Sequence, residues 1–237
     1  MLYKGGTAAL ILSQYLINKN SPVRAKLQLL IYPWLQMFSL ITPSLIHYDD
    51  KVFLEGNAGH VILYYIGYAN QTKEMNDAII SNNHTLLLDE QTRKLFYSYL
   101  DTDLIPDVYK EGCDYYKNGK HAEMLAKIPS KLDESNILIR DTEFANKLKK
   151  VFTPDLSPGL VDGEYLKKLP STYQIVCEWD ALKDDGLIFG ERLKRAGVES
   201  HIAFYKTCFH GLVSSLEQYD IASKIFEDLV RYMENNV

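Results

Sequence analysis

Two short segments near the C-terminus hold side chains of the types that acid–base catalysis uses. Asp180 stands in an acidic segment, residues 178–186, and His210 stands in the tripeptide Phe209-His210-Gly211. A carboxylate that accepts a hydrogen bond from imidazole Nδ1 fixes the tautomer in which Nε2 can take a proton. These are two of the three members of a Ser-His-Asp triad. We therefore predict that Asp180 orients the imidazole and that His210 is the general base.

The nucleophile that would complete such a triad is missing from its usual setting. No Gly-x-Ser-x-Gly segment, which places a serine on a sharp turn between a strand and a helix, occurs in the sequence. An aspartate after a strand is often only a loop residue, and a Phe-His-Gly tripeptide can be an ordinary turn. The spacing alone therefore leaves a purely structural role for Asp180 and His210 open.

Other chemistry-bearing residues give weaker signals. Residues 47–50, His-Tyr-Asp-Asp, contain potential metal ligands, but their spacing matches no usual metal site and a solvated loop explains them better. Cys208 lies two residues before His210, whereas a nucleophile must lie opposite its base. Gly5 and Gly6 are too few for a phosphate-binding loop. We predict neither a metal nor an organic cofactor.

Alternating strand and helix patterns surround the candidate pair and would position it. Residues 172–177 and 199–205 are typical of buried strands, and residues 184–196 form a helical pattern that Gly197 closes. An amphipathic helix is predicted over residues 217–235. Strands and helices in this alternation predict a parallel sheet.

The parallel sheet explains why the two candidate residues would meet. Asp180 follows the first predicted strand by three residues, and His210 follows the second by five. Because the carboxyl ends of parallel strands lie at one edge of the sheet, both side chains are expected there. Gly211 would leave room beside the imidazole. Asp184 and Asp185 are better explained as acidic residues at a helix N-terminus, where the helix dipole favours them.

The N-terminal part of the chain continues the same architecture and then changes. A helix is predicted over residues 7–18 and a buried parallel strand over residues 25–32. From about residue 43 to residue 150 the pattern becomes irregular and helical, with polar loops such as residues 81–84 between the helices. We predict an α/β fold over residues 1–237, a parallel sheet with flanking helices, carrying a helical insertion at about residues 43–150.

Composition excludes several classes of partner. The chain has 237 residues, of which 46% are hydrophobic and 24% charged, and its net charge is −5. No basic run offers the concentrated positive face that nucleic-acid binding needs. Residues 27–46 carry no charge, but Pro33 and Pro43 interrupt them, so a buried strand and loop explain them better than a membrane span. We predict no nucleic-acid partner and no membrane span.

Five segments match, in chain order, the motifs of one enzyme family. They are Gly5-Gly6 with the helix after it, Leu29-Leu30-Ile31-Tyr32-Pro33, Asp155-Leu156-Ser157-Pro158, the acidic segment at residues 178–186, and Phe209-His210-Gly211. In the family they correspond to the end of a Gly-Asp-Ser-Ala-Gly-Gly elbow, the strand that follows it, an Asp-x-Ser-Pro stretch, the acid loop and the histidine loop. The chain resembles the hormone-sensitive-lipase branch of the α/β-hydrolases, and within it the arylacetamide deacetylase-like esterases.

The resemblance implies a function and a division of roles. It implies a carboxylic ester hydrolase of esterase, deacetylase or lipase type, connected to lipid metabolism and acting on apolar ester or amide small molecules. Asp180 would orient the base and His210 would be the base, and no cofactor would be needed. The helical insertion, including residues 60–69, would form part of a lid over an apolar pocket.

The sequence departs from the family at the nucleophile. The alignment puts Tyr3 where the serine belongs, and the family's His-Gly-Gly-Gly oxyanion motif would lie ahead of residue 1. We therefore expect the C-terminal part of the fold, truncated at the elbow and inactive as written, because these two features supply most of the rate. The strand at residues 25–32 would then form a bare sheet edge. The alternative is a non-catalytic truncated paralogue that acts as a binding or interaction module.

The localisation is left open by the sequence. The family is tethered in the endoplasmic reticulum by an N-terminal anchor, with its catalytic domain in the lumen. The first residues of this chain show neither a signal-peptide pattern nor an anchor. Two glycosylation sequons, Asn70-Gln71-Thr72 and Asn83-His84-Thr85, would matter only after translocation.

Overall fold

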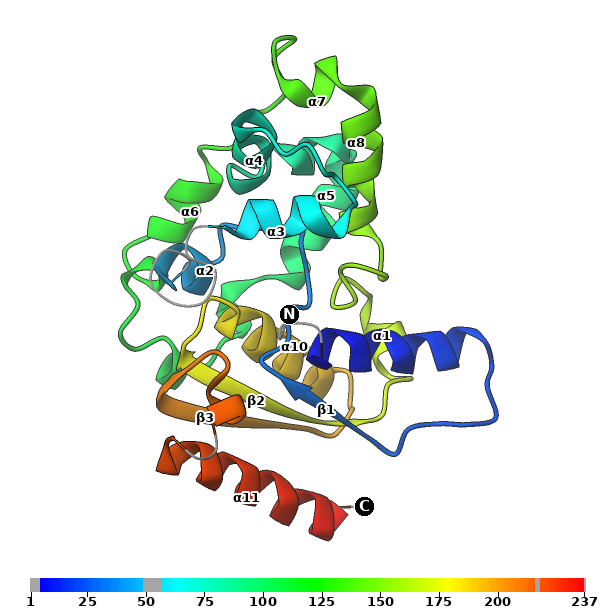
Figure 1. The fold of residues 1–237 in the computed structure, drawn as a ribbon, viewed down its shortest axis with the longest axis vertical. Coiled ribbons are helices and arrows are strands. Elements are labelled where there is room, and N and C mark those ends of the chain that lie inside the picture. The colour runs from blue at the N-terminus through cyan, green and yellow to red at the C-terminus, as the bar shows by residue number, and fades with distance from the viewer. Residues whose placement is uncertain (1–4, 49–56, 216–217, 237) are drawn as a thin grey trace.

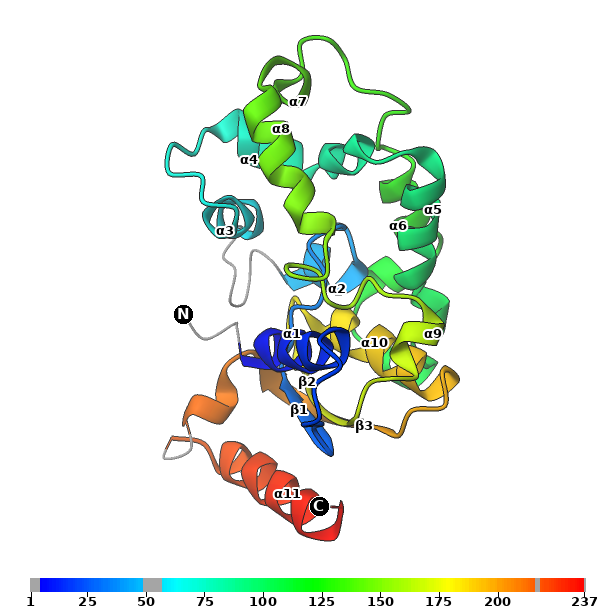
Figure 2. The same ribbon diagram turned by 90° about the vertical axis from the view of Figure 1, so that its right-hand side faces the viewer.

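The structure, a computed structural model, consists of a small sheet layered with helices and a separate group of short helices (Figure 1). It describes residues 5–48, 57–215 and 218–236. The sheet and the three helices that cover it occupy the lower half of both views (Figures 1 and 2). The upper half holds most of the helices of the middle of the chain. These are α2 (Pro43–Tyr48), α3 (Ala58–Tyr65), α4 (Lys73–Ile80), α5 (Glu90–Tyr99), α6 (Lys120–Leu125), α7 (Ile137–Arg140) and α8 (Thr142–Leu148).

The sheet confirms the predicted parallel architecture. Its strands are β1 (Leu27–Ile31), β2 (Ser171–Trp179) and β3 (Ser200–Phe209), in the order β1-β2-β3, and both neighbouring pairs are parallel. Within the described ranges no strand pairs with the outer edge of β1, so β1 is an edge strand as expected. β3 runs four residues further than predicted, so that His210 follows its last residue directly and the four residues expected to form a loop, 206–209, belong to the strand.

Helices cover both faces of the sheet because side chains of successive strand residues point to opposite faces. On one face, Tyr173 and Ile175 of β2 pack with Ile225 and Leu229 of α11 (Asp220–Asn236). The other face is covered by α1 (Gly5–Asn18) and α10 (Lys183–Arg195), and Figure 2 shows α11 on the opposite side from α1. The sheet is thus the middle layer of three.

The helix α10 lies unusually close to the sheet. A Cβ added at Gly190 would lie 2.6 Å from the Gln174 amide nitrogen and 2.6 Å from Ile202 Cδ1. A larger residue at this position would push α10 away from β2 and β3, so glycine permits the close approach. The first turn of α10 carries Asp184 and Asp185, which follow Asp180 closely in the chain.

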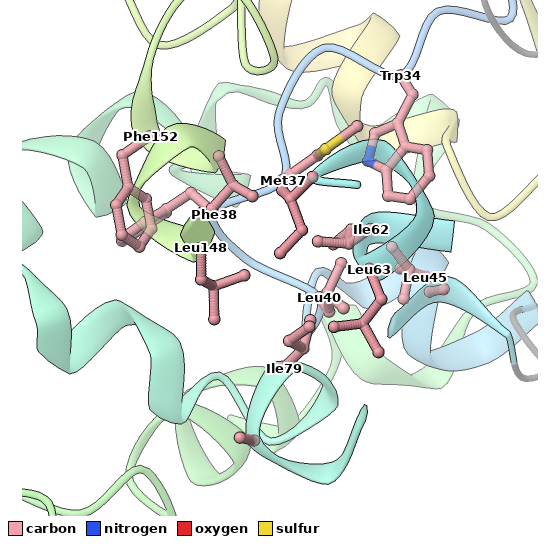
Figure 3. Close-up of a cluster of buried hydrophobic side chains, with 14 of the residues drawn as sticks. Trp34, Met37, Phe38, Leu40, Leu45, Ile62, Leu63, Ile79, Leu148 and Phe152 are labelled. Atoms are coloured by element: carbon pink, nitrogen blue, oxygen red, sulfur yellow. The ribbon is translucent and has the colours of Figure 1, made fainter. Parts of the chain in front are cut away.

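The chain after β1 leaves the sheet and enters a second core. Trp34, Met37 and Phe38 pack there against Ile62 and other side chains of the short helices (Figure 3). The uncharged run at residues 27–46 is therefore a strand, a buried connection and the start of α2. No helix in the described part of the chain combines the length and apolarity needed to cross a membrane.

The predicted polar loop at residues 81–84 proves to be largely buried. Asn82 Oδ1 accepts from the Leu40 backbone N–H at 2.8 Å, and Asn82 Nδ2 donates to Ser39 Oγ at 2.9 Å. The His84 side chain is fully enclosed, with Nε2 3.3 Å from the Met37 carbonyl oxygen. The loop is polar because it satisfies the backbone of the connection after β1, not because it faces water.

Because His84 is buried, the free energy of unfolding is expected to decrease at acidic pH. Desolvation lowers the pKa of His84 to about 4, whereas an unfolded histidine titrates near ~6.5. As the pH falls from the higher of these two pKa values toward the lower, His84 takes up a proton in the unfolded chain before it does so in the folded chain. The free energy of unfolding therefore decreases. We expect the stability advantage of the wild type over His84→Gln to shrink by about 2 kcal/mol between about pH 7 and about pH 5.

Urea unfolding of both proteins at the two pH values measures this effect. Subtracting the variant from the wild type removes the contributions of the other titrating groups. A stability difference that is the same at both pH values would contradict a buried neutral imidazole.

Candidate functional site

The structure brings Asp180 and His210 into contact at the carboxyl edge of the sheet. Asp180 directly follows β2 and His210 directly follows the neighbouring strand β3. Asp180 Oδ2 lies 2.9 Å from His210 Nδ1, and the two residues are only 1% and 7% exposed. The other carboxylate oxygen accepts from the Leu182 backbone N–H at 2.8 Å. Hydrogen bonds therefore fix both oxygens of the Asp180 carboxylate, and the carboxylate in turn orients the His210 imidazole. The catalytic roles of Asp180 and His210 stay predictions.

A bulge in β3 aims His210 at Asp180. Cys177 pairs with Tyr205 and Trp179 with Phe209, so three residues of β3, 206–208, lie opposite Glu178 alone. A bulge of this kind redirects the side chains that follow it.

The bulge is stabilised from the neighbouring strand. Thr207 has a φ of 57°, a left-handed conformation that is unfavourable for a β-branched residue. Its backbone N–H donates to Glu178 Oε2 at 2.8 Å. Neither Glu178 nor Thr207 was identified from the sequence, because no local pattern signals a bulge between strands that are distant in the chain.

Tyr32, the residue after β1, supports the imidazole. Its ring centroid lies 5.0 Å from that of His210, with the planes tilted by 48°. The Tyr32 hydroxyl accepts from the Val213 backbone N–H at 3.1 Å and so holds the loop after His210. Burial raises the pKa of Tyr32, which keeps the phenol protonated. Sequence reasoning noted Tyr32 only within a family motif and assigned it no role.

A cleft of 210 Å³ opens beside His210. The beginning of α1 forms one wall, and the ends of β1 and β3 form the others. Its lining residues are Gly5, Gly6, Leu29, Ile31, Tyr32, His210, Gly211, Val213 and Ser214. Gly6 lies directly on β1, since a Cβ there would be 3.1 Å from the backbone nitrogen and oxygen of Ile31. The first described residues of α1 therefore lie at the cleft beside His210.

Comparison with known proteins shows what this chain is similar to. The profile of a family described as "alpha/beta hydrolase fold" matches residues 127–214, the stretch that holds both Asp180 and His210. Arylacetamide deacetylase of Bos taurus is 28% identical over 212 residues, which cover 90% of this chain and 47% of that protein. Neutral cholesterol ester hydrolase 1 of Rattus norvegicus is 30% identical over 208 residues, covering 87% and 46%. The chain is therefore similar to α/β-hydrolases, arylacetamide deacetylase and neutral cholesterol ester hydrolase among them.

Solved structures show the same fold. An esterase from the archaeon Pyrobaculum calidifontis superposes with a TM-score of 0.54 at 18% identity, covering 98% of this chain and 50% of that one. Carboxyl esterase 2 of the fungus Tuber melanosporum gives a TM-score of 0.54 at 17% identity, covering 99% and 52%. The chain spans about half the length of the relatives and structures that it matches. The predicted fold class and the resemblance read from the motifs are both confirmed.

Gly211 follows His210 directly and has a φ of 87°, a conformation that favours glycine. The backbone turn after His210 therefore gives one reason for a glycine here. The predicted role of leaving room beside the imidazole stays a prediction.

Asp184 and Asp185 do more than complement the helix dipole. Asp185 is buried, and its Oδ2 accepts from the backbone N–H groups of Leu35 at 2.8 Å and Gln36 at 3.2 Å. Its Oδ1 accepts from Gln36 Nε2 at 3.0 Å. Asp184, also buried, accepts from the Ser44 N–H at 2.9 Å. The two carboxylates thus fasten the connection after β1 to α10, next to the acid loop.

Burial shifts the pKa of the Asp185 carboxyl group. Desolvation raises the pKa of Asp185 to about 7, against the three hydrogen bonds from Leu35 and Gln36, which lower it. Asp185 does lie in the first turn of α10, as predicted. Its carboxyl group is buried, however, which was not predicted.

Of the weaker candidates, Cys208 is excluded as a nucleophile by its position. It is fully buried, in the same apolar cluster as Cys177 on the sheet face that α11 covers. Among the residues that the structure describes, no group of three metal-ligating side chains could hold an ion. Asp49, Asp50 and Tyr3 lie outside the described residues.

Ser157 of the Asp-x-Ser-Pro segment links two other parts of the backbone by hydrogen bonds. Its hydroxyl oxygen accepts from the Met37 backbone N–H at 2.7 Å and donates to the Val151 carbonyl at 2.5 Å. Ser157 is fully buried, so it joins the connection after β1 to the end of the helical region.

Proposed function

We propose that this chain is a carboxylic ester hydrolase in which His210 is the general base and Asp180 orients it. The observation that supports this most is the buried Asp180–His210 contact of 2.9 Å beside a cleft walled by the start of α1. In such a site Nε2 of the imidazole takes the proton of the attacking hydroxyl, and a tetrahedral intermediate forms at the carbonyl carbon. The imidazolium then gives that proton to the leaving alcohol or amine.

The substrate class follows from the chemistry of the site and of the relatives. A bovine relative is called an arylacetamide deacetylase and a rat relative a neutral cholesterol ester hydrolase. The cleft is lined by Leu29, Ile31 and Val213 and, among the described residues of its lining, no acidic or basic side chain other than His210 occurs. An uncharged, apolar ester or amide fits this lining, and lipid-derived esters are one such class.

The nucleophile is the open part of the proposal. Hydroxyl groups in the described lining of the cleft belong to Tyr32 and Ser214. The Tyr32 hydroxyl already accepts from Val213 N–H, and its raised pKa makes it a poor nucleophile. Matching Gly5-Gly6 to the family's elbow puts Tyr3 at the position of the family's serine, and Tyr3 lies outside the described residues.

Covalent labelling of the protein purified from its natural source tests the proposal. We expect hydrolysis of p-nitrophenyl acetate and a single site labelled by a fluorophosphonate, which peptide mass spectrometry would locate either ahead of Gly5 or at Ser214. Labelling should disappear in a His210→Ala variant, because the hydroxyl is then no longer activated. If neither hydrolysis nor labelling is found, the esterase proposal fails and a binding or interaction module becomes the better explanation.

The family resemblance also leads us to propose a site of action in the lumen of the endoplasmic reticulum. Asn70 of the first sequon is exposed, whereas Thr85 of the second is buried in the folded chain. A glycan at Asn70, removed by a glycosidase with the matching loss of mass, would support that location. Native protein without any glycan at Asn70 would count against it.

A further inference from the structure

A pocket of 260 Å³ lies in the helical part of the molecule, and its described lining shares no residue with the cleft at His210. Its walls come from the connection after β1, from the end of α5 with η2 (Thr102–Leu104), and from α6. In Figure 2, α5 and α6 are at the right, whereas α1 begins at the left beside the cleft. The ester chemistry proposed above therefore does not use this pocket.

The lining of the pocket is rich in groups that both donate and accept hydrogen bonds. Hydroxyl groups come from Ser39, Thr42, Ser98 and Thr102, and an imidazole comes from His121. Burial lowers the pKa of His121, so at neutral pH its imidazole is uncharged, with one donor and one acceptor nitrogen. Such a lining fits a ligand whose own groups also donate and accept, as hydroxyl groups do.

Thr42 points most directly to a ligand. The residue is 2% exposed, and within the described part of the chain no hydrogen bond joins its hydroxyl to another residue. The Thr42 oxygen is also not among the unpartnered side-chain atoms that are sealed from the surface. It can therefore be reached from the pocket. Because buried polar groups are almost always hydrogen-bonded, this hydroxyl calls for a partner inside the pocket.

Ser39 narrows the kind of group that the pocket accepts. It is also 2% exposed, and its Oγ accepts from Asn82 Nδ2 at 2.9 Å and from the Ile41 backbone N–H at 3.5 Å. Because its oxygen already accepts twice, the hydroxyl of Ser39 has only its proton left to offer. A ligand oxygen can accept that proton, whereas an ammonium group cannot.

The charge of the lining disfavours an anion. Asp101 is exposed at the pocket, and no lysine or arginine occurs among the described lining residues. An anionic ligand would meet this carboxylate without a cation to offset the repulsion. Asp101 Oδ1 accepts from the Asp103 backbone N–H at 2.9 Å, so Oδ2 is left to accept from a ligand hydroxyl.

We propose that this pocket binds a neutral polyol the size of a single sugar ring. Hydroxyl groups of the ligand would bond to Thr42, Ser39 and Asp101, and its C–H groups would contact Leu100 and Leu125. An apolar cavity of about 150 Å³ holds benzene, so 260 Å³ accommodates about ten heavy atoms, as many as a pentose contains. The site goes beyond the proposed ester hydrolysis and does not rest on it.

Binding of D-xylose to the full chain tests the pocket without any catalysis. Saturation-transfer NMR should show contact between D-xylose and the protein, with a Kd on the order of 1 mM. The Cε1–H signal of His121, which a His121→Gln variant assigns among the six histidines, should move in the same titration. Sodium xylonate and serinol hydrochloride, an anion and a cation that both carry hydroxyl groups, should bind about tenfold more weakly.

Two substitutions locate the bound sugar. Thr42→Val keeps the shape of the side chain and removes the hydroxyl, so D-xylose binding should weaken about fivefold while the free energy of unfolding does not decrease. Thr142→Val, at an exposed position in α8 outside the lining, is the matched control and should bind as the wild type does. Ser98→Leu fills the pocket from an exposed position in α5 and should weaken binding about tenfold.

The outcomes also separate this inference from the proposed function. Equal binding of D-xylose by Thr42→Val and the wild type would overturn the polyol site, as would the absence of saturation transfer at about 50 mM D-xylose. Serinol binding as tight as that of D-xylose would overturn it too, because the pocket would then prefer a cation. A chain that binds D-xylose and hydrolyses no ester would support the polyol site and count against the esterase alone.

Discussion

Replacing Asp180 by asparagine is expected to lower kcat/KM for ester hydrolysis by about 10⁴-fold while leaving the fold intact. The carboxylate now accepts from His210 Nδ1 with one oxygen and from Leu182 N–H with the other. An amide has only one oxygen, so one of these two donors would face an NH₂ group. If that donor is the imidazole, the tautomer reverses and Nε2 carries a proton when it should accept one.

Steady-state kinetics of the natural protein with p-nitrophenyl acetate measures this loss. The decrease should lie in kcat with little change in KM, because Asp180 does not touch the substrate. Asp133→Asn, a charge-equivalent change at an exposed loop position, is the control and should retain full activity. Activity within tenfold of the wild type in Asp180→Asn would contradict the assigned role, provided that circular dichroism shows a folded variant.

Replacing Asp185 by alanine is expected to lower the free energy of unfolding by about 3–5 kcal/mol. The substitution leaves three buried donors, the N–H groups of Leu35 and Gln36 and the Gln36 side-chain amide, without an acceptor. It also releases the connection after β1 from α10, next to the loop that carries Asp180. We therefore expect loss of activity to accompany the loss of stability.

Urea unfolding at about pH 8, where the carboxyl is ionised in the folded and the unfolded chain, measures this effect. Asp185→Asn keeps one acceptor and should lose less stability than Asp185→Ala. Glu134→Ala removes an exposed carboxylate and should change stability by less than about 0.5 kcal/mol. A loss below about 1 kcal/mol in Asp185→Ala would show that the three donors find other partners.

Much of the layered fold could be predicted because its signals are local. The apolar runs that became β1 and β2, and the helix that Gly197 ends, are patterns of a few consecutive residues. The meeting of Asp180 and His210 followed from one general rule, since parallel neighbouring strands bring their carboxyl ends to one edge. The family resemblance rested on the same short segments and was confirmed.

Features of the site that depend on distant contacts were missed. The bulge at Thr207 depends on Glu178 in another strand, 29 positions earlier, and Tyr32 holds a loop 181 positions away. Asp185 was explained only as an acid at a helix N-terminus, because its donors at Leu35 and Gln36 lie 150 and 149 positions away.

The sequence by itself predicted the strands and helices of the layered part, the meeting of Asp180 and His210 and the resemblance to α/β-hydrolases, because each depends on residues that are close together or joined by a simple topological rule. Only the tertiary structure decided which contacts hold the His210 loop and that Asp185 and His84 are buried. These properties depend on which distant segments pack together, and burial and hydrogen bonding are fixed only when the chain has folded.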